Sequence, residues 1–374
     1  MLAAVTRSPG EMVVEDVPGP GRRARAGHVI VRPEAVGICG SDFHLFSGDV
    51  GALSGARDFF PRVQGHEVSA IVEDAGDGGD AGIGGDAGIG GDGGDAGIGG
   101  DGGDAGDGGG LKAGERVTIW PLLPCGRCYP CRAGRPNVCI KFRLVGVHLD
   151  GGLQERLEVP AGLVFGVGDM DPDSASFVEP ASVAVHALAR ARLKPGEQAV
   201  VFGAGPIGLA TLVAAVSQGA RVLSVDPVAS RRDLAKRLGA EAVTWAQEAE
   251  LQELAREWTN SEGPPLVVET SGEAGVLPQA VEMVSAAGRV VVVGMSSGTA
   301  PVRPGAFPEK EIDVIGSSCA TAGDFRGAIK LVAANRAAVA ELFSHHFPLA
   351  RAAEAFEFAM SRPPDAIKIV VTVT

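Results

Sequence analysis

The chain contains 374 residues, enough for two or three domains, and hydrophobic residues make up 45% of it, as in ordinary globular proteins. Its net charge of −13 argues against nucleic acid and anionic membranes as partners. No apolar run approaches the roughly 18 residues of a membrane helix, and the first residues lack the apolar core of a signal peptide. We therefore expect a cytoplasmic protein whose thiols stay reduced.

Two short fragments near the N-terminus carry candidate metal ligands. GICGSDFH, residues 37–44, contains Cys39, and GHE, residues 65–67, contains His66 followed by Glu67. Further along, Glu179 adds a carboxylate in the fragment FVEPAS. One Cys, one His and one Glu around zinc give a neutral site with an open fourth position, which is the form of a catalytic zinc. Taken alone, however, such a cysteine is more often a buried thiol, and such a histidine is more often a core residue with its hydrogen bonds satisfied.

Residues 76–110 form a tract of 20 Gly, 8 Asp, 4 Ala and 3 Ile. Without its aspartates the rest of the chain carries only −5. The tract holds too little apolar surface to offset its ordering entropy, so we expect a disordered surface loop. The alternative is a calcium-binding β-roll, but in the register from Gly90 the apolar residue Ile98 comes one place late. The tract separates two strand-like runs, 68–73 and 115–120, and is interpreted as an insertion in a hairpin-like connection.

Four of the six cysteines lie in the fifteen-residue run CGRCYPCRAGRPNVC, residues 125–139. The spacing is C-x2-C-x2-C-x7-C, with Cys125, Cys128, Cys131 and Cys139. In a reducing compartment such a cluster indicates metal ligands before disulfides. Closely spaced thiolates on a Gly/Pro-rich loop can close a tetrahedron around zinc without a hydrophobic core. The alternative is four free or redox-active thiols.

From residue 199 onward, apolar strand-like runs alternate with helical stretches. The predicted strands are AVVF, RVLSV, AVTW, LVVET, RVVVVG and DVIGS, and the predicted helices are 206–219, 230–238, 249–258 and 276–286. Six strands with such crossovers are typical of a doubly wound parallel sheet.

The first turn of this region reads GAGPIG and is typical of a dinucleotide site. Gly203 allows a tight turn, Gly205 lets a pyrophosphate approach bare backbone, and Gly208 lets the helix pack closely on the strand. Pro206 and Ile207 complete the turn, after which the helix amides face the pyrophosphate.

The residues that follow this turn bear on which dinucleotide binds. Asp226 ends the next strand, where its carboxylate can accept both ribose hydroxyls and would repel a 2′-phosphate, so NAD is favoured. Arg231 and Arg232 lie nearby and keep NADP as the alternative. Val293 and Gly294, at the end of the fifth strand, are expected to line the nicotinamide pocket.

Together these motifs resemble the zinc-containing medium-chain alcohol dehydrogenases over nearly the full chain, interrupted only by the Gly/Asp tract. The resemblance rests on GICGSDFH, GHE, the four-cysteine run, VGVHLDGGLQERLEVP, EPASVAVHA, GAGPIG, GRVVVVG and the ending HHFPLARAAEAFEF with IKIVV. Within that superfamily, the Glu-Pro pair at Glu179 and the GVHLDGG pattern resemble the sorbitol, threonine and sugar-acid dehydrogenases. The ethanol-type enzymes carry a cysteine where Glu179 stands.

The resemblance implies roles for individual residues. Cys39 and His66 match catalytic zinc ligands, and Glu67 and Glu179 are both candidates for the third ligand. Ser41 matches a hydroxyl that contacts the substrate oxygen and accepts its proton. The clustered cysteines match a structural zinc lobe, residues 121–140.

Two further positions have weaker assignments. His44 matches the histidine that ends the family's proton relay, with a solvent-exposed loop histidine as the alternative. Cys319 matches nothing and is expected to be a core thiol.

The resemblance also implies an α/β architecture of two domains. Residues 1–167 and 318–374 would form a GroES-like, β-rich catalytic domain, and residues 168–317 would form the NAD-binding Rossmann domain, with the active site in the cleft. The protein would be a homodimer or homotetramer with two zinc ions per chain, one catalytic and one structural.

The implied reaction is zinc-dependent transfer of a hydride between NAD and a secondary alcohol of a polyol, sugar or sugar acid. A threonine-type or general secondary alcohol dehydrogenase is the alternative within the same chemistry. A zinc-independent quinone or enoyl reductase would lack the GHE-plus-cysteine set. A non-catalytic NAD-binding or redox-sensing protein is the alternative of another class. No motif fixes the substrate alcohol.

Overall fold

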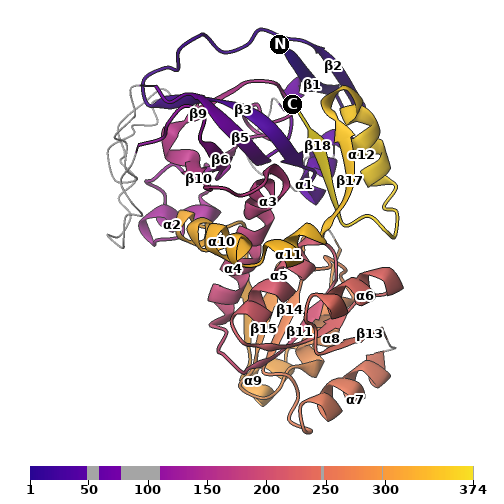
Figure 1. Cartoon of the computed structure of the whole chain (residues 1–374). Helices are drawn as coiled ribbons and strands as arrows, with labels where there is room; N and C mark the ends of the chain where they lie inside the picture. The colour runs from indigo at the N-terminus through magenta and orange to yellow at the C-terminus, as the bar shows by residue number, and fades with distance from the viewer. Residues whose placement is uncertain (49–58, 77–109, 246–247, 297, 374) are drawn as a thin grey trace. The chain divides into compact units, whose positions relative to one another are not determined.

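The computed structural model describes residues 1–48, 59–76, 110–245, 248–296 and 298–373 (Figure 1). It contains two compact units, one formed by Met1–Glu179 with Phe343–Thr374 and the other by Pro180–Leu342. The predicted Gly/Asp tract lies, apart from its two end residues, outside the described residues. Within the described ranges, no helix combines the length and apolar character needed to cross a membrane.

The first unit is built on mostly antiparallel strands. Its largest sheet has seven strands in the order β10-β6-β5-β3-β18-β17, with β9 also paired to β3. These strands are β3 (His28–Gly37), β5 (Glu67–Asp74), β6 (Arg116–Ile119), β9 (Leu157–Pro160), β10 (Val164–Gly166), β17 (Phe343–Pro348) and β18 (Lys368–Thr372). Two smaller sheets pair β2 (Glu11–Asp16), β1 (Leu2–Ser8) and β4 (Arg62–Val63), and β7 (Leu122–Leu123) with β8 (Arg143–Leu144).

Strand β5 lies between β3 and β6 in the large sheet. It pairs antiparallel with β6, with Ser69 opposite Thr118, so the two runs that flank the Gly/Asp tract are neighbours as predicted. Strand β18, yellow in Figure 1, pairs with β3 on one side and with β17 on the other. The last strand of the chain is therefore an interior strand of the sheet that carries the N-terminal motifs.

Helices of the first unit cover this framework. They are α1 (Gly40–Ser47), α2 (Tyr129–Arg132), α3 (Pro172–Ser176) and α12 (Ala352–Met360). On α12 the residues Ala352, Ala355, Phe356 and Ala359 are buried, the spacing of one helical face. That face joins a core cluster in which the ring centroids of Phe356 and Phe46 lie 5.5 Å apart. Because Phe46 belongs to α1, this contact anchors α1 to the core.

The second unit has one six-stranded parallel sheet in the order β13-β12-β11-β14-β15-β16. The strands are β11 (Gln198–Phe202), β12 (Arg221–Val225), β13 (Ala242–Thr244), β14 (Leu266–Glu269), β15 (Arg289–Val292) and β16 (Asp313–Gly316). The strand order reverses at β11 and β14, the arrangement of a doubly wound dinucleotide-binding sheet. The central strands are continuous apolar runs because helices cover both faces of such a sheet. The predicted fold class is confirmed.

The helices of this unit are α4 (Val178–Ala191), which begins at the end of the first unit, α5 (Pro206–Ser217), α6 (Ala229–Arg237), α7 (Glu248–Trp258), α8 (Val276–Met283), α9 (Ala306–Lys310), α10 (Ala322–Ala334) and α11 (Arg336–Ala340). The predicted helix 276–286 is too long, because α8 ends at Met283 and Val284 takes an extended backbone. The ammonium of Lys310 accounts for this end. It donates to the carbonyls of Val281, Glu282 and Val284 at 3.1, 2.6 and 3.3 Å.

The division into units differs from the expected boundaries, 168–317 for the Rossmann domain. The second unit continues to Leu342 because α10 packs on α4, where His186 Nδ1 lies 2.8 Å from Asp324 Oδ2. At the far end of α10, Asn335 accepts a hydrogen bond of 3.0 Å from Ser217 on α5. These contacts join residues 318–342 to the parallel sheet rather than to the β-rich unit.

Candidate functional site

Cys39, His66 and Glu67 come together in the first unit. Their ligand atoms, one from each residue, all lie within 4.8 Å of one another. Cys39 is the N-cap of α1, Glu67 is the first residue of β5, and His66 directly precedes it. His66 and Glu67 are buried, with 3% and 1% exposure. A cysteine sulfur, an imidazole and a carboxylate so close together, the last two shielded from water, fit a zinc ion by donor chemistry.

The backbone before His66 needs glycine. Gly65 has φ +93°, a conformation that other residues rarely adopt. Side chains added to Gly146 or Gly151 would overlap the Gly65 backbone, so the GVHLDGG segment crosses it without side chains between. The glycines of this motif thus permit the close approach that fixes the direction of His66.

Asp42 is a site residue that the sequence analysis missed. It is fully buried, and its Oδ2 accepts a hydrogen bond of 2.9 Å from the Cys39 amide, closing a capping box at the start of α1. Its Oδ1 lies 3.4 Å from Nδ1 of His66. Because Nδ1 faces a carboxylate, Nε2 is the nitrogen left for a metal. An acidic residue three positions after an N-cap is the pattern that could have identified Asp42.

The charges around His66 alter its protonation. Burial disfavours the imidazolium, but Asp42 and the Cys39 thiol outweigh burial and raise the pKa of His66 well above its ordinary value. Since a protonated imidazole cannot ligate, we expect metal to compete with protons at this ring.

Two other predicted residues lie on the same short helix. Ser41 has its Oγ 3.4 Å from Nε2 of His66, so its hydroxyl lies beside the nitrogen that is free for a metal. His44 lies in the last turn of α1 and is half-buried. Its role in a proton relay stays a prediction.

Lys368 is a second residue that the sequence analysis missed. It is 1% exposed, forms an ion pair with Glu67 and donates a hydrogen bond of 3.0 Å to the Ile38 carbonyl. Burial opposes its charge, but the carboxylate of Glu67 and the Cys39 thiol raise its pKa. A side chain on Gly37 would overlap the Glu67 carboxylate, so this glycine makes room for the pair. Lys368 is the first residue of β18, far in sequence from the GHE motif, and no local sequence pattern predicts its contact with Glu67.

Glu179 lies near this group without belonging to it. Burial raises its pKa to about 7, with repulsion from Glu67 adding to the shift and the positive charges of His66 and Lys368 opposing it. Its carboxylate is not part of the group in which the ligand atoms of Cys39, His66 and Glu67 all lie within 4.8 Å of one another. The structure therefore supplies two carboxylates, one paired with lysine and one that protonates readily.

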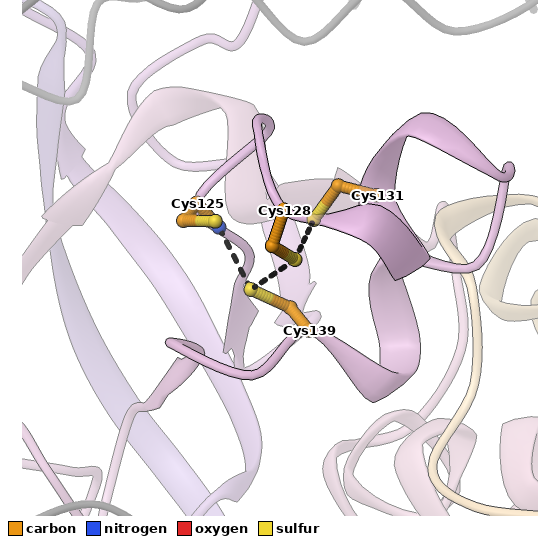
Figure 2. A group of neighbouring side chains, drawn as sticks. All are labelled: Cys125, Cys128, Cys131 and Cys139. Carbon is orange, nitrogen blue, oxygen red and sulfur yellow. Dashed lines mark hydrogen bonds between the residues drawn. The ribbon is translucent and has the colours of Figure 1, made fainter.

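The four clustered cysteines also converge (Figure 2). Their sulfur atoms lie within 4.8 Å of one another, and none of the six cysteines, all of which the structure describes, forms a disulfide. Cys128 Sγ lies 3.4 Å from that of Cys131 and 3.7 Å from that of Cys139. The Cys139 sulfur accepts hydrogen bonds from the amides of Cys125 and Lys141 at 3.2 and 3.3 Å.

The protonation of these thiols shows how strongly they interact. Burial opposes the Cys128 thiolate, yet the amides of Cys131 and Ile140 and the neighbouring thiols lower its pKa to about 6. Burial and its cysteine neighbours raise the pKa of Cys131 to about 12. Four sulfurs at these separations, with amides directed at them, fit a tetrahedral zinc.

The glycine turn of the second unit has the predicted geometry. Gly203 has φ +92°, and a Cβ on Gly208 would overlap the Gly203 carbonyl, so the third glycine permits the close packing of α5 on β11. A Cβ on Gly205 would meet nothing within 4 Å, so the space beside it is open. Pro206 and Ile207 are the first residues of α5.

Asp226 follows β12 and is 3% exposed. Its carboxylate accepts hydrogen bonds from the amides of Ala204 and Val228 at 2.7 and 2.8 Å, which holds it against the glycine turn. Arg232 donates to the Asp226 carbonyl at 2.6 Å, and Arg231 lies one residue before it on α6.

Val293 and Gly294 follow β15, at the carboxyl edge of the same sheet. Both amides donate to the Glu269 carbonyl, at 2.8 and 3.1 Å. The Oε1 atom of Glu269 accepts from the amides of Ser271 and Gly272 at 2.6 and 2.9 Å. This buried glutamate, which the sequence analysis missed, shapes the edge where such sheets bind nucleotides.

Comparison with known proteins agrees with this geometry. Residues 25–89 and 100–169 match the family profile described as "Alcohol dehydrogenase GroES-like domain", and residues 206–334 match "Zinc-binding dehydrogenase". The chain is 30% identical over 375 residues to L-galactonate-5-dehydrogenase from Escherichia coli (strain K12), covering 100% of this chain and 99% of the relative.

Two solved structures share the fold. An alcohol dehydrogenase from E. coli CFT073, complexed with NADH, has a TM-score of 0.82 at 26% identity. A zinc-binding dehydrogenase from Sinorhizobium meliloti 1021, bound to NADP, has a TM-score of 0.81 at 28% identity. In both cases the likeness covers 100% of this chain and 99% of the other. The predicted resemblance is confirmed, and the chain belongs to the family of zinc-containing medium-chain alcohol dehydrogenases.

Proposed function

We propose that the protein transfers a hydride between NAD and a secondary hydroxyl of a polyol, sugar or sugar acid, with one zinc ion held at Cys39 and His66. As a member of its family it is an enzyme acting on CH–OH groups with zinc and a nicotinamide cofactor. The observation that carries the proposal is the group of Cys39, His66 and Glu67, whose ligand atoms lie within 4.8 Å of one another and of which His66 and Glu67 are buried. The similarity to a dehydrogenase named for L-galactonate supports a sugar-derived substrate. Nothing in the family assignment supports a non-catalytic protein.

The residues of α1 have distinct parts in the proposed reaction. A zinc ion held at Cys39 and His66 would supply Lewis acidity, which would make the substrate hydroxyl easier to ionise near neutral pH. The Ser41 Oγ lies 3.4 Å from His66 Nε2. This hydroxyl oxygen accepts the proton of the substrate and at the same time releases its own hydroxyl proton to the next group. His44, one helical turn further along α1, delivers the proton outward.

The third protein ligand is one of two glutamates. Glu67 is closer to Cys39 and His66 but is paired with Lys368. Glu179 lies outside the 4.8 Å group, and its pKa of about 7 lets it exchange a proton near neutral pH. We propose that one of these two glutamates, Glu67 or Glu179, provides the third ligand of the zinc ion.

For the cofactor, we propose NAD at the glycine turn. The Asp226 carboxylate lies buried against this turn, where a 2′-phosphate would meet its negative charge. Arg231 and Arg232 on α6 keep NADP as the alternative, and one related structure was solved with NADP. Fluorescence titration of the protein with NADH and NADPH distinguishes the two.

The remaining proposals concern composition. A second zinc ion, of structural type, is proposed at Cys125, Cys128, Cys131 and Cys139. We also propose a homodimer or homotetramer, which light scattering on the purified protein tests directly.

The function is tested by metal analysis together with a substrate panel. Polyols, sugars, aldonates, threonine and simple secondary alcohols are offered with NAD, and NADH is followed by its absorbance. We expect two zinc ions per chain, turnover of a polyol or sugar acid, and loss of turnover after chelation. A folded protein without zinc, or activity indifferent to chelators, contradicts the proposal. Turnover of threonine or simple secondary alcohols alone would favour the alternative substrate class.

A further inference from the structure

Two buried polar side chains behind the candidate metal centre are not explained by the motifs. Thr6 on β1 and Gln64, between β4 and β5, are both fully buried. Burying such groups is costly unless their hydrogen bonds are satisfied. An apolar pair of similar size would fill the same space without that cost. Their chemistry therefore calls for an explanation beyond packing.

The two side chains form a continuous chain of hydrogen bonds that ends on Asp42. Thr6 Oγ1 donates to Gln64 Oε1 at 2.6 Å. Gln64 Nε2 donates to the Asp42 main-chain carbonyl at 3.0 Å and lies 3.5 Å from Asp42 Oδ1. Gln64 thus contacts both the backbone and the carboxylate of Asp42.

The direction of this chain is fixed by chemistry. A main-chain carbonyl only accepts hydrogen bonds, so the Gln64 amide must present its NH₂ group to Asp42 and its oxygen to Thr6. The Thr6 hydroxyl must then be a donor. The Asp42 carbonyl consequently sets which way the amide points, and Thr6 supplies the donor that the buried amide oxygen needs.

Asp42 in turn contacts two proposed metal ligands. Its Oδ2 accepts from the Cys39 amide at 2.9 Å, and its Oδ1 lies 3.4 Å from His66 Nδ1. A rotation of the Asp42 carboxylate would therefore change the direction of the His66 ring and loosen the first turn of α1, which carries Cys39.

We propose that Gln64, held in place by its hydrogen bond from Thr6, is a positioning residue for the metal centre. It fixes Asp42 from behind, so that Cys39 and His66 face the metal in one arrangement. This inference rests on the proposed function, because it requires a metal at Cys39 and His66. Groups behind the ligands commonly change metal affinity by 10–100-fold, and a single neutral hydrogen bond changes it by roughly 5–10-fold.

The test uses the full chain, stripped of metal and titrated with Co²⁺ against a competing chelator. The absorption of Co²⁺ differs between a four-thiolate site and a mixed site, so the cysteine lobe acts as an internal reference. Thr6→Val keeps the shape of the side chain but loses the hydroxyl, whereas Thr6→Ser keeps the hydroxyl. Gln64→Met keeps the length of the side chain but loses its hydrogen bonds to Thr6 and Asp42.

We expect Thr6→Val and Gln64→Met to weaken Co²⁺ at the mixed site by about 5–10-fold and to change its spectrum, with the lobe unaffected. Thr6→Ser should behave as wild type. If Gln64→Met does not fold, the two Thr6 variants still decide the question. Unchanged Co²⁺ affinity and spectrum in folded variants would overturn the inference alone. A wild-type protein that binds Co²⁺ only at the lobe would overturn the metal centre and the inference together.

Discussion

The carboxylate of Asp42 is shared between the N-cap of α1 and the imidazole of His66. Cys39, His66 and Glu67 could be predicted because each stands in a short motif with metal-binding residue types. Asp42 was within reach of the same reasoning, as the third residue after an N-cap. Lys368 and Gln64 could not be predicted in this way. Their partners, Glu67 and Asp42, are brought to them by the fold and are not their neighbours in the sequence.

For Asp42→Asn we expect metal affinity at Cys39 and His66 to fall by about 10–100-fold. The amide retains the size of the side chain but removes the negative charge that faces His66 Nδ1. Chelator competition with zinc measures the loss. Asp365→Asn, at an exposed position, serves as the control and should bind zinc as wild type does. Equal affinities in the two variants would show that the charge of Asp42 has no part in metal binding.

At the scale of elements, the sequence predicted most of the parallel sheet because its strands are apolar runs and its helices are amphipathic. The predicted end of α8 was wrong because Lys310, from another helix, binds the last carbonyls of α8 and the helix stops there. Helix α10 was not predicted, although its start carries a capping box of Thr321 and Asp324. The junctions between elements depend on such single contacts, which periodicity does not report.

The glycine turn offers a matched pair of substitutions. Gly208→Ala should destabilise the protein by more than about 2 kcal/mol, because its methyl group would overlap the Gly203 carbonyl. Gly205→Ala should fold normally, since nothing lies within 4 Å of its added methyl, yet bind NADH more weakly because that space is proposed for the pyrophosphate. Thermal unfolding and NADH titration separate the effects. Wild-type NADH affinity in Gly205→Ala would argue against the proposed cofactor position.

The start of α10 should show a defined pH dependence. Burial opposes the charge of Asp324, but hydrogen bonds from His186 and Thr321 outweigh it and lower its pKa. A carboxyl whose pKa is lower in the folded state stabilises that state above its ordinary pKa, and this contribution disappears as the pH falls through the folded value.

Asp324→Asn should therefore cost about 1–2 kcal/mol at neutral pH, and the difference from wild type should start to shrink below about pH 4 and vanish once the pH has fallen through the lowered pKa of Asp324. Denaturant titrations across pH measure it. Asp313→Asn, which removes an exposed ion pair with Arg192, should cost less than about 1 kcal/mol. A pH-independent cost at Asp324 would rule out the charge as its cause.

At the scale of the whole molecule, the order of the motifs was enough to predict two units of different architecture. The boundaries were harder, because residues 318–342 follow the last parallel strand and their attachment is decided by α10 packing on α4. The pairing of β18 with β3 could not be predicted either, because IKIVV has the composition of any buried strand and does not indicate its neighbour.

The two proposed metals should separate by stoichiometry. Cys128→Ser removes one of four thiolates, so we expect zinc to fall from two ions per chain to one and trypsin to cut the lobe at its exposed arginines. Cys319→Ser, outside both clusters, should retain two ions. Zinc content and peptide mapping provide the readout. Two ions in a folded Cys128→Ser protein would contradict the four-cysteine assignment.

Strand β18 has one more consequence, for biosynthesis. The Lys368 ammonium reaches the Ile38 carbonyl and Glu67 across a separation of 330 positions from Ile38. While the ribosome has made only the first three hundred residues, the Glu67 carboxylate has no counter-ion, and β3 lacks one of its neighbours. The dinucleotide-binding unit, by contrast, is continuous in sequence and can fold as it emerges. We therefore expect the proposed metal site to be completed only after translation has passed Lys368.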